Sequence, residues 1–158
     1  IEKAAGTGNV SYDPDNHEYM VRLRQAKIDG IADDLPPLVV EDPSGRAKVL
    51  VVGWGSSYGP ISAAARRVRL SGRAVATLHL RHLNPLPADL GDILRRYDRV
   101  IVPEMNLGQL AMILRAKYLV DCESYSRVRG LPISLSELAE DLIDVIDEKT
   151  PNEPKEGR

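Results

Sequence analysis

Residues 49–59 read Val-Leu-Val-Val-Gly-Trp-Gly-Ser-Ser-Tyr-Gly, an apolar run that passes directly into a loop of small residues. An uninterrupted aliphatic run of this length is typical of a strand that is buried on both faces of a sheet. Apolar residues then recur every three or four positions over 59–70, which is the spacing of one helix face. The stretch therefore predicts a strand, a tight turn and a helix, the repeating unit of an α/β fold.

The same unit recurs twice further along the chain. Strands are predicted over 74–80 and 99–103, and each is followed by a polar loop and an amphipathic helix, over 88–97 and 107–115 respectively. Strands that alternate with helices are joined by right-handed crossovers and pair in parallel. We therefore predict an α/β fold with a mainly parallel sheet that is covered by helices on both faces.

The remainder of this region is less regular. A short fourth strand is expected over 118–120, an extended segment over 122–128, and a closing helix over 135–146 with Ser134 or Ser136 as its N-cap.

The N-terminal part of the chain has a different character. A helix is expected over 15–31 with only one narrow apolar stripe, and the proline-containing stretch 33–46 is expected to be a linker. We therefore divide the chain into an N-terminal helical extension (1–46), the α/β domain (47–148) and a tail (149–158). The tail has no apolar periodicity and is expected to be disordered.

Composition excludes several classes of protein. The formal net charge of the 158 residues is −2, so no overall positive field favours nucleic acid, and no apolar stretch approaches the length of a membrane span. Aromatic residues make up only 4% of the chain, so its core must be aliphatic. The single cysteine, Cys122, excludes an internal disulfide and an all-cysteine cluster or zinc site. We expect a cytoplasmic protein without nucleic-acid or membrane partners.

The loops that follow the three predicted strands are the candidate functional region. In parallel sheets, ligands and partners meet the loops at the carboxyl ends of the strands. The candidate residues of this rim are Gly53, Gly55, Ser56, Ser57, Tyr58, His79, Arg81, Asn84, Glu104 and Asn106. We expect them to contact a partner subunit or a neighbouring domain, and we predict no catalytic or metal-binding residue.

Each of these motifs has two interpretations. The glycines of 53–59 could cradle a dinucleotide, but Tyr58 stands where the third glycine belongs, so a tight turn that needs small residues is the alternative. His79 and His82 with Glu104 could ligate a metal or could hydrogen-bond a partner. Glu104 and Asn106 could serve acid–base chemistry or cap the next helix.

The basic run of Arg66, Arg67, Arg69 and Arg73 leaves the same kind of choice. It could receive an anionic ligand or an acidic protein, or it could be a solvated helix face.

Four motifs also resemble one enzyme family. Residues 8–14 (Gly-Asn-Val-Ser-Tyr-Asp-Pro), 52–60 (Val-Gly-Trp-Gly-Ser-Ser-Tyr-Gly-Pro), 83–87 (Leu-Asn-Pro-Leu-Pro) and 102–110 (Val-Pro-Glu-Met-Asn-Leu-Gly-Gln-Leu) are similar to the alpha subunit of 2-oxoglutarate:ferredoxin oxidoreductase, in the 2-oxoacid:acceptor oxidoreductase family. The likeness runs from about residue 8 to 146 and covers the C-terminal portion of that subunit. The absence of Met before Ile1 agrees with a portion of a longer chain.

The resemblance implies a thiamine-diphosphate enzyme. That enzyme decarboxylates 2-oxoglutarate, passes electrons through a 4Fe-4S cluster to ferredoxin and forms succinyl-CoA from coenzyme A. Its beta subunit holds the diphosphate, Mg and the cluster, and the portion seen here resembles the transketolase C-terminal domain, which mainly builds subunit contacts. The implied partners are the preceding alpha-subunit portion, the beta subunit, a second copy of the heterodimer and ferredoxin, and no cofactor is expected on this chain alone.

Two functional hypotheses therefore stand after the sequence has been read. The chain is an assembly and interdomain domain of that oxidoreductase, inactive by itself, or it is a free-standing ligand-binding or regulatory α/β module.

Overall fold

The computed structural model describes residues 1–148, and these form two compact units. One unit comprises Ile1–Pro37 together with His82–Ala88, and the other comprises 38–81 together with 89–148. The tail at 149–158, for which the sequence predicts disorder, lies outside the described residues. None of the helices within 1–148 is both long and apolar enough to cross a membrane.

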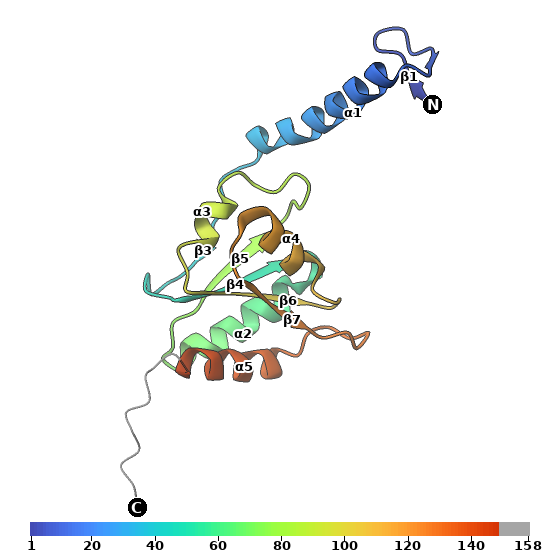
Figure 1. The fold of residues 1–158 in the computed structure, drawn as a ribbon. Coiled ribbons are helices and arrows are strands. Elements are labelled where there is room, and N and C mark those ends of the chain that lie inside the picture. Colours follow the sequence, from blue (N-terminus) through green and yellow to red (C-terminus); the bar gives the residue numbers. More distant parts are fainter. Residues whose placement is uncertain (149–158) are drawn as a thin grey trace, which may run out of the picture. The chain divides into compact units, whose positions relative to one another are not determined.

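The larger unit is built on a five-stranded sheet (Figure 1). Its strands are β3 (Val40–Glu41), β4 (Val49–Trp54), β5 (Ala76–Leu80), β6 (Arg99–Glu104) and β7 (Cys122–Ser126), in the spatial order β3-β5-β4-β6-β7. Strand β4 runs parallel to β5 and β6, and β6 runs parallel to β7, whereas β3 is antiparallel to β5. The predicted mostly parallel sheet is thus confirmed, with one short antiparallel strand at its edge.

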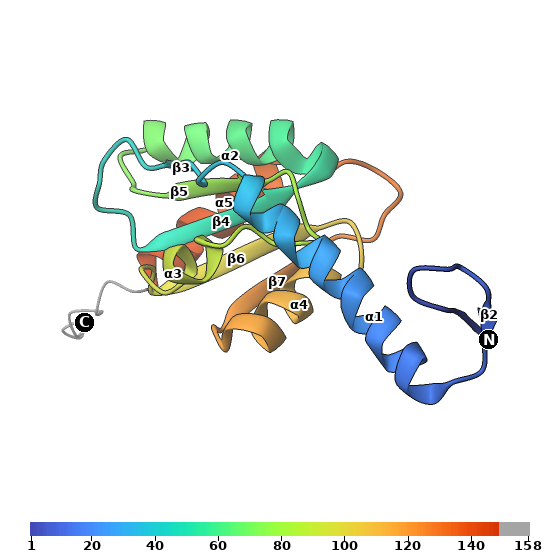
Figure 2. The same ribbon diagram turned by 90° about the horizontal axis from the view of Figure 1, so that it is seen from above.

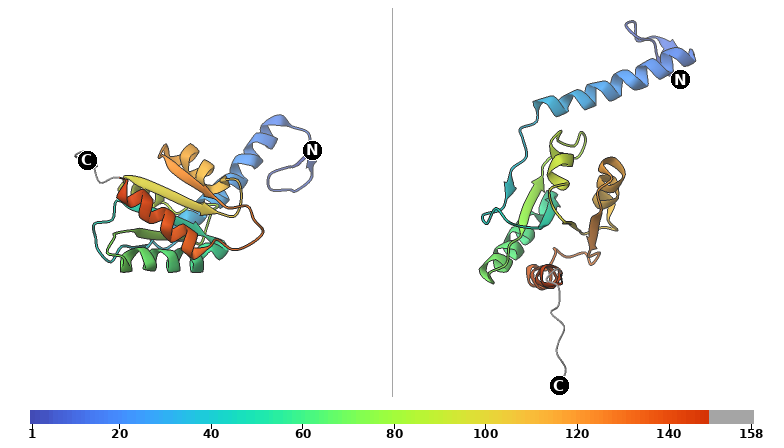
Figure 3. Two further views of the ribbon diagram at one scale, coloured as in Figure 1. Left: turned by 90° about the horizontal axis from the view of Figure 1, so that it is seen from below. Right: turned by 60° about the vertical axis from the view of Figure 1, so that its left-hand side comes forward.

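Helices pack on the two sides of this sheet. Helices α2 (Tyr58–Leu70) and α5 (Leu135–Asp147) lie side by side on one face, and α3 (Leu90–Leu94) and α4 (Gln109–Tyr118) lie on the other (Figures 1 and 3). Ser134 caps α5, because its hydroxyl accepts a hydrogen bond from the Glu137 amide at 3.3 Å. The start of α5 is therefore one that its sequence predicts.

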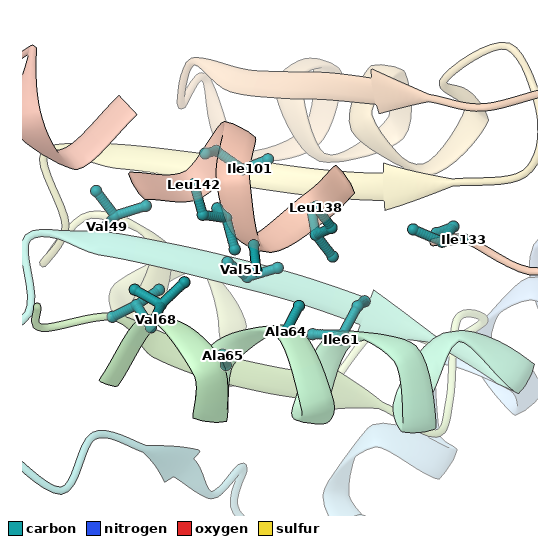
Figure 4. Close-up of a cluster of buried hydrophobic side chains, with 12 residues drawn as sticks. Val49, Val51, Ile61, Ala64, Ala65, Val68, Ile101, Ile133, Leu138 and Leu142 are labelled. Carbon is teal, nitrogen blue, oxygen red and sulfur yellow. The ribbon is translucent and has the colours of Figure 1, made fainter. Parts of the chain in front are cut away.

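The core explains why β4 is apolar without interruption. Val49 and Val51 point toward α2 and α5, where they pack with Ala64, Val68 and Leu142 (Figure 4). Side chains alternate along a strand, so the intervening Leu50 and Val52 point to the opposite face, and both are fully buried. A strand covered on both sides needs apolar residues at every position.

The basic run of α2 has a structural role in this unit. Arg73 makes a two-pronged ion pair with Asp147 of α5, with nitrogen–oxygen distances of 2.8 and 2.7 Å. Arg67 contacts Ser136 and Glu140 of the same helix. Arg69 donates to the carbonyl oxygens of Val75 and Glu41 instead. These three guanidinium groups join α2 and the segment that follows it to their neighbours, so the structure supports a packing role over an anion site.

Two expectations for this unit differ from the structure. The strand predicted over 118–120 is wrong, because Tyr118 ends α4 and Leu119 follows it with a left-handed backbone, φ 54°. The fourth parallel strand is β7, which confirms the extended segment expected over 122–128. It is an edge strand in which only Cys122 is buried, so it carries no apolar pattern. In addition, the stretch expected to be a linker contains β3.

The smaller unit consists of a hairpin and a helix. Strands β1 (Glu2–Lys3) and β2 (Val10–Ser11) pair in an antiparallel manner, and α1 (Pro14–Asp29) continues into the 3₁₀ turn η1 (Gly30–Asp34). Asp13 is the N-cap of α1 and accepts from the Asp15 amide at 3.0 Å. No residue of α1 is buried. The helix expected over 15–31 is thus confirmed, and its narrow apolar stripe is not buried within the described residues.

Candidate functional site

The ends of β4, β5 and β6 define the candidate site. These three strands are neighbours and run parallel, so the residues that follow them emerge at the same edge of the sheet (Figure 2). We call residues 53–58, 79–81 and 104–108 the carboxyl edge. Asn84 belongs to the other compact unit, where it is exposed and is joined to Pro85 by a cis peptide bond.

The turn after β4 is held closed from within. The Ser57 hydroxyl accepts a hydrogen bond from the Trp54 amide at 3.1 Å and donates one to the Trp54 carbonyl at 2.7 Å. A Cβ at Gly53 would lie 2.6 Å from Ile61 Cδ1 and 3.3 Å from His79 Nδ1, so glycine lets α2 and β5 approach this strand. Gly55 has a φ of 57°, which also favours glycine. The structure therefore supports the tight-turn interpretation.

Tyr58 and His79 form an aromatic pair at this edge. Their ring centroids are 5.1 Å apart with an interplanar angle of 71°, and the Tyr58 side chain is exposed. Burial lowers the pKa of His79 below its usual value, and the positive charge of Arg81 lowers it further. Both effects favour the neutral imidazole. Residues 1–148 contain no group of three or more His, Cys, Asp or Glu side chains placed to hold a metal ion.

Glu104 is the most deeply buried polar residue of the carboxyl edge. It is only 2% exposed, and its carboxylate accepts hydrogen bonds from the backbone amides of Leu110 at 2.9 Å and Ala111 at 3.1 Å. It also accepts from Asn106 Nδ2 at 3.0 Å. The first amides of a helix have no partner within the helix and attract negative charge. Glu104 therefore caps α4, and its carboxylate faces into the protein.

Asn106 completes this cap from the loop. Its side-chain oxygen accepts from the amides of Gly108 at 2.8 Å and Gln109 at 3.0 Å. Gly108 has a φ of 85°, and a Cβ there would collide with the Ser124 side chain of β7. The loop between β6 and α4 is thus fixed by one carboxylate, one amide and one glycine.

The exposed side chains of the carboxyl edge are not the ones that hold its loops in place. Tyr58, Arg81, Met105 and Leu107 are exposed there. The helix predicted over 107–115 begins only at Gln109, so Leu107 lies before it and is 87% exposed. Met105 and Gly108 are not among the residues predicted for this rim. The signal for Gly108 was present, because a glycine just before a helix often marks a left-handed turn.

The fold and the carboxyl edge together define a class of protein. The larger unit is an α/β domain with a mostly parallel sheet, whose polar edge groups stabilise loops and whose exposed edge groups offer a surface. The chain belongs to the family of pyruvate:ferredoxin oxidoreductase core domain II, whose model matches residues 47–138.

The comparisons with individual proteins agree with that family. The chain is 57% identical over 138 residues to 2-oxoglutarate oxidoreductase subunit KorA of Mycobacterium tuberculosis, covering 87% of this chain and 21% of that protein. It is 35% identical over 146 residues to subunit alpha of 2-oxoacid:ferredoxin oxidoreductase 1 of Aeropyrum pernix, covering 88% of this chain and 23% of that protein. The chain thus spans about a fifth of the length of these two curated relatives.

A solved structure shows the same fold. The 2-oxoglutarate:ferredoxin oxidoreductase from Magnetococcus marinus, solved with 2-oxoglutarate, coenzyme A and succinyl-CoA bound, superposes with a TM-score of 0.83 at 31% identity. The match covers 92% of this chain and 26% of that chain.

Proposed function

We propose that this chain is an assembly and interdomain domain of the alpha subunit of a 2-oxoglutarate:ferredoxin oxidoreductase. The proposal includes a sheet domain of the transketolase C-terminal type, a thiamine-diphosphate holoenzyme in the cytoplasm, and contacts to the rest of the alpha subunit, the beta subunit and a second heterodimer. The 57% identity to a 2-oxoglutarate oxidoreductase subunit supports the choice of substrate. The Magnetococcus marinus enzyme supports it as well.

The residues present do not fit the cofactors of such an enzyme. Cys122 is the only cysteine and its side chain is completely buried, and burial raises the pKa of its thiol to about 11. It therefore cannot supply the thiolates of an iron–sulfur cluster. The oxygens of the buried Glu104 carboxylate already accept hydrogen bonds from two amides of α4. We therefore propose that other parts of the holoenzyme hold thiamine diphosphate, Mg and the cluster.

The assembly role is supported by two different sets of residues at the carboxyl edge: one set holds the loops in place, and the other is exposed. Ser57, Glu104 and Asn106 bind the backbone of their own domain, so they form a rigid support. Tyr58 and Arg81 lie exposed on that support, and aromatic and arginine side chains contribute strongly to protein interfaces. A fixed surface that exposes Tyr58 and Arg81 is better suited to binding another protein surface than to catalysis.

We expect Arg81→Ala and Tyr58→Ala to weaken subunit assembly. The full-length alpha subunit is mixed with its partner subunit, and the dissociation constant is measured by analytical ultracentrifugation. Each variant should raise it about tenfold, which corresponds to roughly 1.4 kcal/mol for one anchoring side chain. Arg66→Ala is the matched control, since Arg66 is an exposed arginine of α2 outside the carboxyl edge.

The alternative, a free-standing module, predicts that neither substitution changes subunit assembly. If Arg81→Ala and Tyr58→Ala assemble as tightly as Arg66→Ala, the carboxyl edge is not the assembly surface.

A further inference from the structure

His79 is a partly buried residue of the carboxyl edge, at the last position but one of β5. It lies in register with Gly53 of β4, and a Cβ at position 53 would lie 3.3 Å from His79 Nδ1, so the glycine leaves room for the imidazole. Within residues 1–148 the two ring nitrogens make no hydrogen bond. The imidazole therefore contributes to this edge through its ring contacts and its charge.

Tyr58 is the aromatic side chain that His79 contacts. Tyr58 begins α2, and its side chain is exposed. The two rings meet edge-on, with centroids 5.1 Å apart and planes at 71°, and aromatic pairs attract each other in this geometry. An exposed side chain otherwise populates several rotamers, and fixing it on binding costs conformational entropy. A Tyr58 ring that His79 already holds therefore loses less entropy when the carboxyl edge docks.

We propose that His79 is a positioning residue of the carboxyl edge, whose neutral imidazole holds the Tyr58 ring in the orientation that docks. This inference rests on the proposed function, which makes Tyr58 an anchor of the assembly surface. It adds a residue that acts through Tyr58 and does not itself touch the surface that docks.

The charges around His79 indicate when the contact holds. Arg81, in the loop after β5, is the charged side chain whose field reaches the imidazole, while α2 brings the Tyr58 ring and β4 brings the uncharged Gly53. Burial lowers the pKa of His79, and the positive charge of Arg81 lowers that pKa further. Protonation would place a second cation beside Arg81 in a partly dehydrated position. The imidazolium is therefore expected to leave Tyr58 for water.

The sign of the pH effect follows from the direction of this shift. A histidine in an unfolded chain titrates at about pH 6.5. Because the pKa of folded His79 lies lower, its contact with Tyr58 is complete above about pH 6.5 and is lost as the pH falls through the folded pKa. Assembly through the carboxyl edge should therefore weaken in mildly acidic solution.

The binding experiment uses the full-length alpha subunit and its partner subunit. At about pH 7.5, His79→Ala should raise the dissociation constant about fivefold, because the freed Tyr58 ring must then be fixed on docking. His79→Phe keeps an aromatic ring and loses no hydrogen bond, so it should bind like the unchanged subunit. In a Tyr58→Ala background, His79→Ala should add less than about twofold, because it acts through Tyr58. Arg66→Ala is again the control.

The pH profile is a readout that a purely structural histidine would not change. Lowering the pH from about 7.5 to about 5.5 should raise the dissociation constant of the unchanged subunit about fivefold more than that of His79→Phe. With 3-fluorotyrosine at position 58 of the full-length alpha subunit, the ¹⁹F NMR signal should shift with a midpoint below about pH 6.5. The same signal should not shift in His79→Phe.

The possible results distinguish this inference from the proposed function. If Tyr58→Ala impairs assembly while His79→Ala binds like Arg66→Ala, or if His79→Phe keeps the full pH dependence, only this inference fails. An undiminished effect of His79→Ala in the Tyr58→Ala background would mean that His79 touches the docked surface itself, which overturns its positioning role. If Tyr58→Ala and Arg81→Ala both assemble like Arg66→Ala, the proposed function fails, and this inference fails with it.

Discussion

Replacing Glu104 by alanine is expected to lower the free energy of unfolding of the chain by about 3 kcal/mol, because it leaves buried amides without partners. The carboxylate accepts from the amides of Leu110 at 2.9 Å and Ala111 at 3.1 Å, which lie in the first turn of α4. Asn106 also loses the acceptor of its side-chain amide. Urea denaturation followed by circular dichroism measures the change.

Two further variants show whether the cap is the cause. Glu104→Gln keeps one acceptor oxygen but directs an N–H group toward an amide, so a smaller loss of about 1–2 kcal/mol is expected. Glu140→Ala removes an exposed carboxylate of α5, whose ion pair with Arg67 spans 3.7 Å, and should cost less than about 1 kcal/mol. A loss for Glu104→Ala no larger than that for Glu140→Ala would refute the capping role.

Gly108→Ala is expected to destabilise the chain by a similar amount, about 3 kcal/mol. A left-handed backbone costs an L-residue about 1–2 kcal/mol, and overpacking adds about 1–3 kcal/mol. Both causes apply, because Gly108 has a φ of 85° and a Cβ would meet the Ser124 hydroxyl and lie 3.1 Å from its Cβ. The shift in the urea midpoint is the measurement.

The control and the rescue distinguish these two causes. Gly59→Ala adds a Cβ that has no atom within 4 Å in a helix, so it should be neutral or stabilising by up to about 1 kcal/mol. Ser124→Ala should recover part of the loss in the double variant by removing the hydroxyl, while the strain remains. If Gly108→Ala is as mild as Gly59→Ala, the loop between β6 and α4 is not held as described.

The repeated unit of the fold could be read from the sequence because burial leaves a periodic trace. Strand β4 is apolar at every position and α2 at every third or fourth, so both were predicted nearly to their ends. Strand β7 was expected only as an extended segment, because an edge strand with polar side chains leaves no apolar alternation. The short strand β3 was not predicted, because it leaves no apolar alternation either.

The candidate site was predictable in position but not in detail. Topology alone places the loops after β4, β5 and β6 at one edge. The role of Glu104 depends on where α4 begins, and that depends on the left-handed turn at Gly108. Helix capping was one of the two interpretations of Asn106 and Glu104 in the sequence, and it accounted for Asn106 more fully than for Glu104.

The measurement that tests the central claim most directly is 2-oxoglutarate-dependent dye reduction by the purified chain. Thiamine diphosphate, Mg and coenzyme A are supplied, and the assembled alpha and beta subunits serve as the positive control. The account predicts no turnover by the chain alone, because decarboxylation requires a bound and oriented cofactor and onward transfer requires a cluster, and the described residues provide neither. Turnover by the chain alone, free of other subunits, would contradict its assignment as an assembly domain.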